Sequence, residues 1–120
     1  MTMELNRAGI EAALAHGGGT HNFDDVRESI ERGDLHYWPR GDSFVVTEIE
    51  VYPRKKVCHI FLAAGKMDDM RALLPGVEQW ARVNGCAAVS LLGRLGWGRS
   101  FMRDAGFESS FLRMVKEIAL

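Results

Sequence analysis

Three side chains in the middle of the chain can exchange protons. Glu48 and Glu50 alternate with apolar residues, so they share one face of an extended strand. Repulsion between two such carboxylates can prepare one of them to accept a proton. His59 lies in an apolar run, and an imidazole can act as an acid or a base. Two alternatives stay open: the glutamates occupy an ordinary solvated strand face, and His59 is a hydrogen-bonded histidine of the core.

A second group of residues combines arginine with tryptophan. Arg94, Trp97, Arg99 and Arg103 lie close together in the sequence, and the last two are spaced to share one face of a short helix. Guanidinium groups beside an indole can bind a carboxylate, a phosphate or the surface of a partner. The sequence therefore predicts a partner-binding face here, with a solvated helix face as the alternative.

The composition limits the class of protein. A chain of 120 residues, 47% hydrophobic and 26% charged, is typical of one globular domain. The formal net charge of −1 gives no overall attraction to nucleic acid or anionic lipid. There is no membrane-length apolar run and no signal-like segment, so we expect a cytoplasmic chain with no nucleic-acid or membrane partner. Cys58 and Cys86 lie in apolar runs without metal-ligand spacing, which predicts buried thiols and no metal.

Two helices are predicted to open the chain. The first covers residues 3–16, and Asn6 is expected to cap it. The second begins at Asn22, which should form a capping box with Asp25, and it ends at Gly33.

Strands and two further helices follow from the periodicity. The predicted strands cover residues 35–38, 43–52, 57–63, 86–92 and 111–118. A turn at 53–56 makes an antiparallel hairpin of the second and third strands. A helix then crosses from the third strand to the fourth, so these two should be parallel neighbours. Pro75 should kink this helix or delay its start. Its predicted core residues are Leu73, Leu74, Val77 and Trp80.

This order of elements resembles the Gcn5-related N-acetyltransferase superfamily, in a short form such as tailed bacteriophages encode. The similar segments are the strand 87–92, the short helix 97–105 with Gly106-Phe107, and the long helix with its Asn84-Gly85 stop. The resemblance implies an α/β (α+β) fold with a mixed, largely antiparallel sheet, one parallel pair and helices on both faces. It also implies one domain over residues 1–120, with the helices in 1–33 and the rest in 34–120.

The acetyl-CoA loop of that family is altered in this chain. The family pattern is Arg/Gln-x-x-Gly-x-Gly/Ala, and its backbone N–H groups hold the pyrophosphate. Residues 63–70 read Ala-Ala-Gly-Lys-Met-Asp-Asp-Met, which leaves Ala63, Gly65 and Lys66 as candidate cofactor-binding residues. Asp68 and Asp69 carry negative charge to where phosphate would lie, so weak or absent acetyl-CoA binding is predicted. One of these two aspartates is expected to be the helix N-cap.

The catalytic acid and base implied by the resemblance are also in question. The position of the family's tyrosine acid is Met102 here, and its neighbour Phe101 cannot donate a proton either. Glu48, Glu50 and His59 are the candidates for the base.

Two functions of different classes follow. In the first, the chain is a non-catalytic virion, internal structural or assembly protein of a bacteriophage, with no cofactor, in the host cytoplasm or packaged in a virion. Its protein partner would be another virion protein or a second copy of itself, bound by the arginine–tryptophan face. In the second, it is an N-acetyltransferase that moves an acetyl group from acetyl-CoA to an amine.

Overall fold

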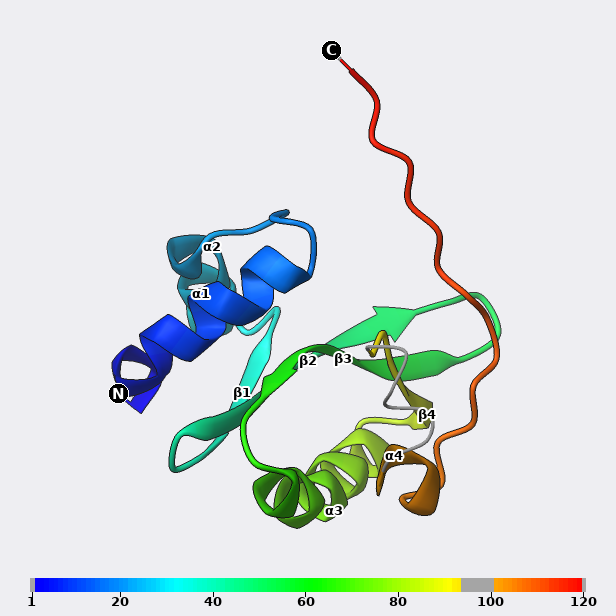
Figure 1. The fold of residues 1–120 in the computed structure, drawn as a ribbon. Helices are drawn as coiled ribbons and strands as arrows, with labels where there is room; N and C mark the ends of the chain where they lie inside the picture. The colour runs from blue at the N-terminus through cyan, green and yellow to red at the C-terminus, as the bar shows by residue number, and fades with distance from the viewer. Residues whose placement is uncertain (1, 94–100, 120) are drawn as a thin grey trace.

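The computed structural model describes residues 2–93 and 101–119 (Figure 1). In chain order the elements are η1 (Thr2–Asn6), α1 (Arg7–His16), α2 (Phe23–Arg32), β1 (His36–Arg40), β2 (Ser43–Val51), β3 (Lys56–Ala64), α3 (Met67–Val83), β4 (Cys86–Leu91) and α4 (Phe101–Asp104). None of the helices in this part of the chain is both long and apolar enough to cross a membrane.

The strands form one mixed sheet in the order β1-β2-β3-β4. β2 pairs antiparallel with both β1 and β3, whereas β3 and β4 are parallel. Figure 1 shows α1 and α2 on one side of the sheet and α3 on the other. The predicted fold class, the hairpin and the helical crossover are therefore confirmed.

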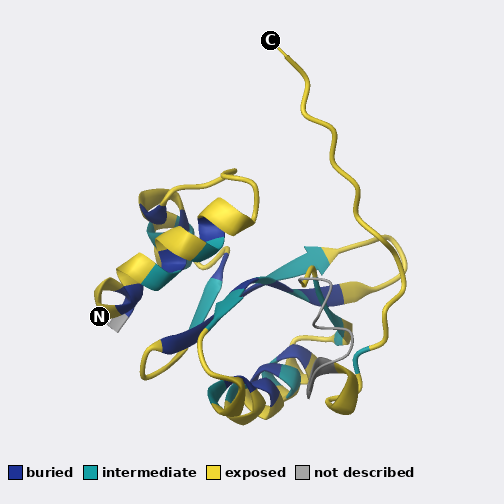
Figure 2. Ribbon diagram, viewed as in Figure 1, coloured by how far each residue is buried: buried dark blue, intermediate teal, exposed yellow. Residues whose placement is uncertain are grey.

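Two apolar clusters attach the helices to the sheet (Figure 2). β2 serves both, because successive side chains of a strand point to opposite faces. The cluster under α1 and α2 contains Ile10, Leu14, Phe23, Val26, Phe44, Val46 and Leu62. The cluster under α3 contains Val45, Cys58, Ile60, Met70, Leu74, Val77 and Ala81. Of the residues predicted to form the helical part of this core, Leu74 and Val77 are buried, while Leu73 and Trp80 are half-buried.

The two predicted N-caps have different outcomes. Asn22 and Asp25 form the expected capping box, with Asn22 Oδ1 accepting from the Asp25 N–H at 2.8 Å. Asn6 stands at the N-cap of α1 but makes no capping bond. Its side-chain amide instead donates to the Tyr37 hydroxyl at 2.7 Å, which ties the N-terminus to β1.

The strand predicted at 111–118 is wrong, and the prediction about Pro75 is settled in part. α3 begins at Met67 and continues through Pro75, so a delayed start is excluded, while a kink stays a prediction. Pro75 is exposed, and the helix continues past it although proline has no N–H to donate. Residues 111–118 form no strand. A strand needs a hydrogen-bonded neighbour, and in the described residues nothing pairs with this segment.

Candidate functional site

A β-bulge in β3 changes the face of the sheet on which the side chains beyond it lie. Val46 lies opposite Leu62, but the next residue, Thr47, lies opposite Ile60, so Phe61 is an extra residue in β3. Regular alternation would direct His59 and Leu62 to opposite faces of the sheet. With the bulge, both line the same pocket on the side of the N-terminal helices.

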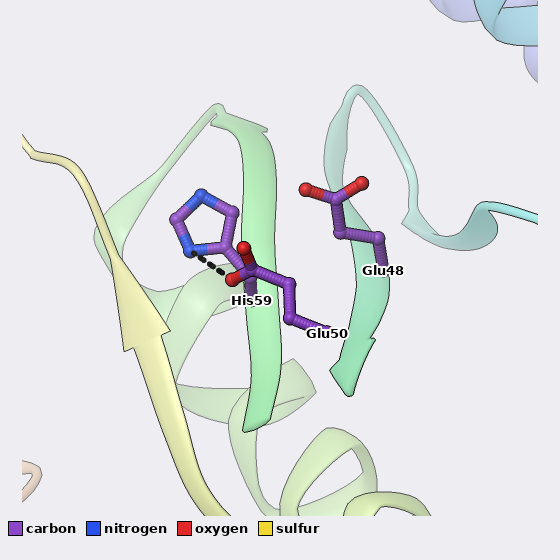
Figure 3. Close-up of side chains that lie close together, drawn as sticks. All are labelled: Glu48, Glu50 and His59. Carbon is purple, nitrogen blue, oxygen red and sulfur yellow. Dashed lines mark ion pairs between the residues drawn. The ribbon is translucent and has the colours of Figure 1, made fainter. Parts of the chain in front are cut away.

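The strand register brings the three predicted proton-exchanging residues together. Glu48 lies opposite His59 across β2 and β3, and His59 lies opposite Ser90 across β3 and β4. One potential ligand atom from each of Glu48, Glu50 and His59 lies within 4.8 Å of the others. Figure 3 shows the two carboxylates beside the imidazole. All three side chains are half-buried, so the two glutamates are not on a fully solvated face, while the hydrogen bond to Ser90 agrees with the alternative that His59 is a hydrogen-bonded histidine of the core.

The imidazole of His59 is held through one ring nitrogen. Its Nδ1 lies 2.9 Å from Ser90 Oγ and 3.8 Å from Glu50 Oε1. A serine–histidine–acid triad needs the acid and the serine on opposite ring nitrogens, so these three residues do not form one. When Nδ1 donates its proton to Ser90 Oγ, Nε2 carries the free lone pair and can accept a proton.

Glu50 has a second partner in Tyr52. The Tyr52 hydroxyl donates to Glu50 Oε2 at 2.9 Å. This hydrogen bond raises the pKa of Tyr52, because the phenol must be protonated to donate. The carboxylate of Glu50 is therefore oriented between Tyr52 and His59. Two carboxylates and an imidazole can also hold a divalent cation, but surface acids often gather without one, and we assign no metal role to them.

His59 forms part of the wall of a pocket of about 230 Å³. The pocket lies between the end of α1 and β3, and its lining combines apolar and polar side chains. The lining residues are Leu14, Gly17, Thr20, His59, Phe61, Leu62, Leu92 and Arg113. Pockets for drug-sized ligands start at about 300 Å³, so this one suits a small group or the end of a longer side chain. Another hollow, of about 540 Å³, lies beside α4 and contains none of the predicted catalytic residues.

Beside this pocket the edge of β3 is open. β4 pairs with β3 only as far as Ile60, opposite Leu91. In the described residues, no strand pairs with 61–64 on the side of β4. The backbone N–H and C=O groups on this side of Ala63 and its neighbours can therefore pair with the amides of an extended ligand.

The loop from β3 to α3 is organised by Ser43. The Lys66 N–H donates to Ser43 Oγ at 3.0 Å, and Ser43 donates to Asp69 Oδ2 at 2.6 Å. Arg40 Nε lies 3.4 Å from Asp69 Oδ1. The N-cap of α3 is Lys66, whose side chain makes no capping bond, so the prediction that Asp68 or Asp69 caps the helix is wrong. Asp69 is directed to the β1–β2 hairpin, and Asp68 is exposed.

The predicted arginine–tryptophan face lies largely outside the described residues. Arg94, Trp97 and Arg99 lie outside the described residues, and Arg103 is exposed on α4. The partner-binding face stays a prediction.

Sequence reasoning missed Ser90. It is the one hydroxyl in the apolar run of β4 and could have been noticed for that reason. Its position opposite His59, however, depends on the register of two strands that are far apart in the sequence.

The comparisons with known proteins define the fold. No protein-family model and no curated protein matches the sequence. A solved acetyltransferase from Trypanosoma brucei is similar in structure, with a TM-score of 0.65 and 15% identity over 96% of this chain and 94% of that chain. Glucosamine-6-phosphate N-acetyltransferase from Arabidopsis thaliana gives a TM-score of 0.68 and 16% identity over 99% of this chain and 95% of that one.

These similarities place the chain in the class of mixed α/β acetyltransferase-like folds. More specifically, it has the fold of the Gcn5-related N-acetyltransferases. At these identities the similarity establishes the fold and leaves the activity to be argued from the site.

Proposed function

We propose that the protein is an N-acetyltransferase that transfers an acetyl group from acetyl-CoA to an amine, with His59 as the general base. The observation that carries this proposal is the position of His59. It is hydrogen-bonded to Ser90, lies beside Glu50, lines a pocket of about 230 Å³, and adjoins the open edge of β3. An amine is protonated at neutral pH and must lose a proton before it can attack a carbonyl carbon, so the reaction needs such a base.

The contacts of Asp69 support the binding of acetyl-CoA in this proposal. The sequence placed two carboxylates at the start of α3, where they would repel phosphate. In the structure, Arg40 and Ser43 engage Asp69, so Asp68 is the one exposed carboxylate in the first turn of α3. The first turn of α3 has no side-chain cap, and N–H groups there favour an anion.

Three residues would hold acetyl-CoA in this proposal. Ala63 would offer backbone groups along the open edge of β3, while Gly65 and Lys66 would border the phosphates at the start of α3. The bound thioester would supply an activated acetyl carbon, and its leaving thiolate resembles that of cysteine, whose thiol has a pKa of about 8.5, so it needs no dedicated acid. A phenol in the position of Met102 is then not required.

The chain's own residues would bind the amine and move its proton. Glu48 and Glu50 present negative charge to an incoming ammonium group. Nε2 of His59 then accepts one proton from that group, directly or through a water molecule, while Nδ1 keeps its hydrogen bond. The neutral amine forms the new C–N bond as the C–S bond breaks, and its second proton passes to solvent.

The second candidate is a non-catalytic assembly protein of the same fold. The observation that favours it is the loop at Gly65, which packs on Ser43, while the Lys66 N–H is already bonded to that serine. Because the Lys66 N–H is already bonded within the protein, this loop has fewer backbone N–H groups to donate to a phosphate. A role in a bacteriophage virion stays a prediction from the sequence resemblance.

An assay of thiol release separates the two candidates. The full chain is incubated with acetyl-CoA and a panel of small amines and amine-bearing peptides, and free thiol is measured. His59→Gln should lower turnover by about 10²- to 10⁴-fold, the usual contribution of a general base. His16→Gln, which changes an exposed histidine at the end of α1, is the matched control. Turnover that survives His59→Gln would contradict the assigned role of this residue.

A further inference from the structure

The C-terminal segment exposes a run of large apolar side chains. Phe107 packs against the cluster under α3, and the chain then leaves the body of the protein (Figure 1). The exposed fraction is 97% for Phe111 and 69% for Val115. Leu112, Met114 and Ile118 are exposed as well. Exposed apolar runs of this kind usually mark an interaction surface.

The sequence of this segment is complementary to itself. Two copies can run antiparallel with Val115 opposite Val115. Leu112 then lies opposite Ile118, and Arg113 lies opposite Glu117. Because the arrangement is twofold symmetric, each of these two pairs occurs twice. Apolar pairs and pairs of opposite charge are the combinations that stabilise antiparallel strands.

The charges of Arg113 and Glu117 favour this register over two alignments shifted towards the start of the segment. A shift that centres the pairing between Met114 and Val115 brings Arg113 opposite Lys116, which repel each other. A shift that centres it on Met114 brings Arg113 opposite Val115 and Glu117 opposite Phe111, so neither of these charges has an opposite charge across from it. Only the register centred on Val115 pairs Arg113 with Glu117.

We propose that residues 111–119 form an interface between two copies of this chain, as an antiparallel ribbon centred on Val115. The partner is a second copy, because the charge pattern is complementary to itself. An isolated two-stranded ribbon is marginally stable, so a weak, concentration-dependent dimer is expected. Since Arg113 also lines the pocket beside His59, the partner's tail would lie near the mouth of that pocket.

Charge reversal tests the proposal on the full chain. Sedimentation equilibrium over a range of concentrations should show a dimer for the wild type. R113E and E117R each place like charges at both symmetric positions and should raise the dimer dissociation constant by about tenfold or more. Glu108→Arg makes the same charge change as E117R in the same exposed segment but outside the ribbon, and should leave the constant unchanged.

A mixture of the two variants gives the sharpest result. When R113E is mixed with E117R, every cross-strand pair between unlike chains is again one acid and one base, so heterodimers should form. A wild type that stays monomeric at every concentration would overturn the proposal. So would a dimer that neither reversal weakens, or a mixture that does not associate although both parents have lost the dimer.

Discussion

Replacing Gly65 by alanine should destabilise the protein strongly, because two independent costs coincide there. Its backbone φ is +124°, a conformation that side chains other than glycine rarely adopt. An added Cβ would also lie 2.6 Å from the Cα of Ser43, inside van der Waals contact. Backbone strain of this kind costs about 1 to 3 kcal/mol, and overpacking costs about as much again. Gly65→Ala should therefore lower the free energy of unfolding by about 2 to 6 kcal/mol.

Gly76→Ala is the matched control, and it should have the opposite sign. Gly76 lies within α3, and no atom lies within 4 Å of the position its Cβ would take. Alanine in a helix interior is more stable than glycine by about 0.5 to 1 kcal/mol. Urea denaturation followed by circular dichroism measures both variants. A Gly65→Ala variant as stable as the wild type would refute the described contact between the β3–α3 loop and Ser43.

Two further predictions concern stability. Asn22→Ala removes the capping bond to Asp25 and should lower the free energy of unfolding by about 1 kcal/mol, measurable in the same urea titration; an unchanged midpoint would show that the capping box contributes nothing. Burial raises the pKa of the Cys58 thiol from 9.0 to about 11. The protonated thiol is therefore favoured in the folded state. The stabilisation that the buried, protonated thiol gives to the folded state is complete below pH 9 and is lost as the pH rises towards 11. The difference in the free energy of unfolding between wild type and Cys58→Ala should therefore shrink over that range. A difference that stays constant from pH 8 to pH 11 would contradict the burial of this thiol.

Local signals in the sequence predicted most of the fold. The turn at 53–56 and the apolar period of α3 suffice for the hairpin and the parallel crossover, because both depend on residues close in sequence. The capping box of α2 was predictable for the same reason. The hydrogen bond of Asn6 was not predictable, because its side-chain amide donates to Tyr37, which only the tertiary fold brings near.

The sequence predicted part of the arrangement around His59, and it missed the geometry. Alternation placed Glu48 and Glu50 on one face, and they do lie together beside His59. The bulge at Phe61, however, has no mark in the sequence, and without it the face shared by His59 and Leu62 cannot be foreseen. Asp69 was assigned to the helix cap because its local position suits one, whereas Arg40 and Ser43 draw it to the hairpin. The strand expected at 111–118 failed because strand propensity does not supply a pairing partner.

Titration calorimetry of the full chain with acetyl-CoA tests the proposed function most directly. Binding by the folded state must also raise the melting temperature as the ligand concentration increases. Since Asp69 is engaged by Arg40 and Ser43, we expect a dissociation constant on the order of 10 µM and competition by free CoA. An absence of heat and of any thermal shift at millimolar acetyl-CoA would contradict the proposed N-acetyltransferase and favour the non-catalytic alternative.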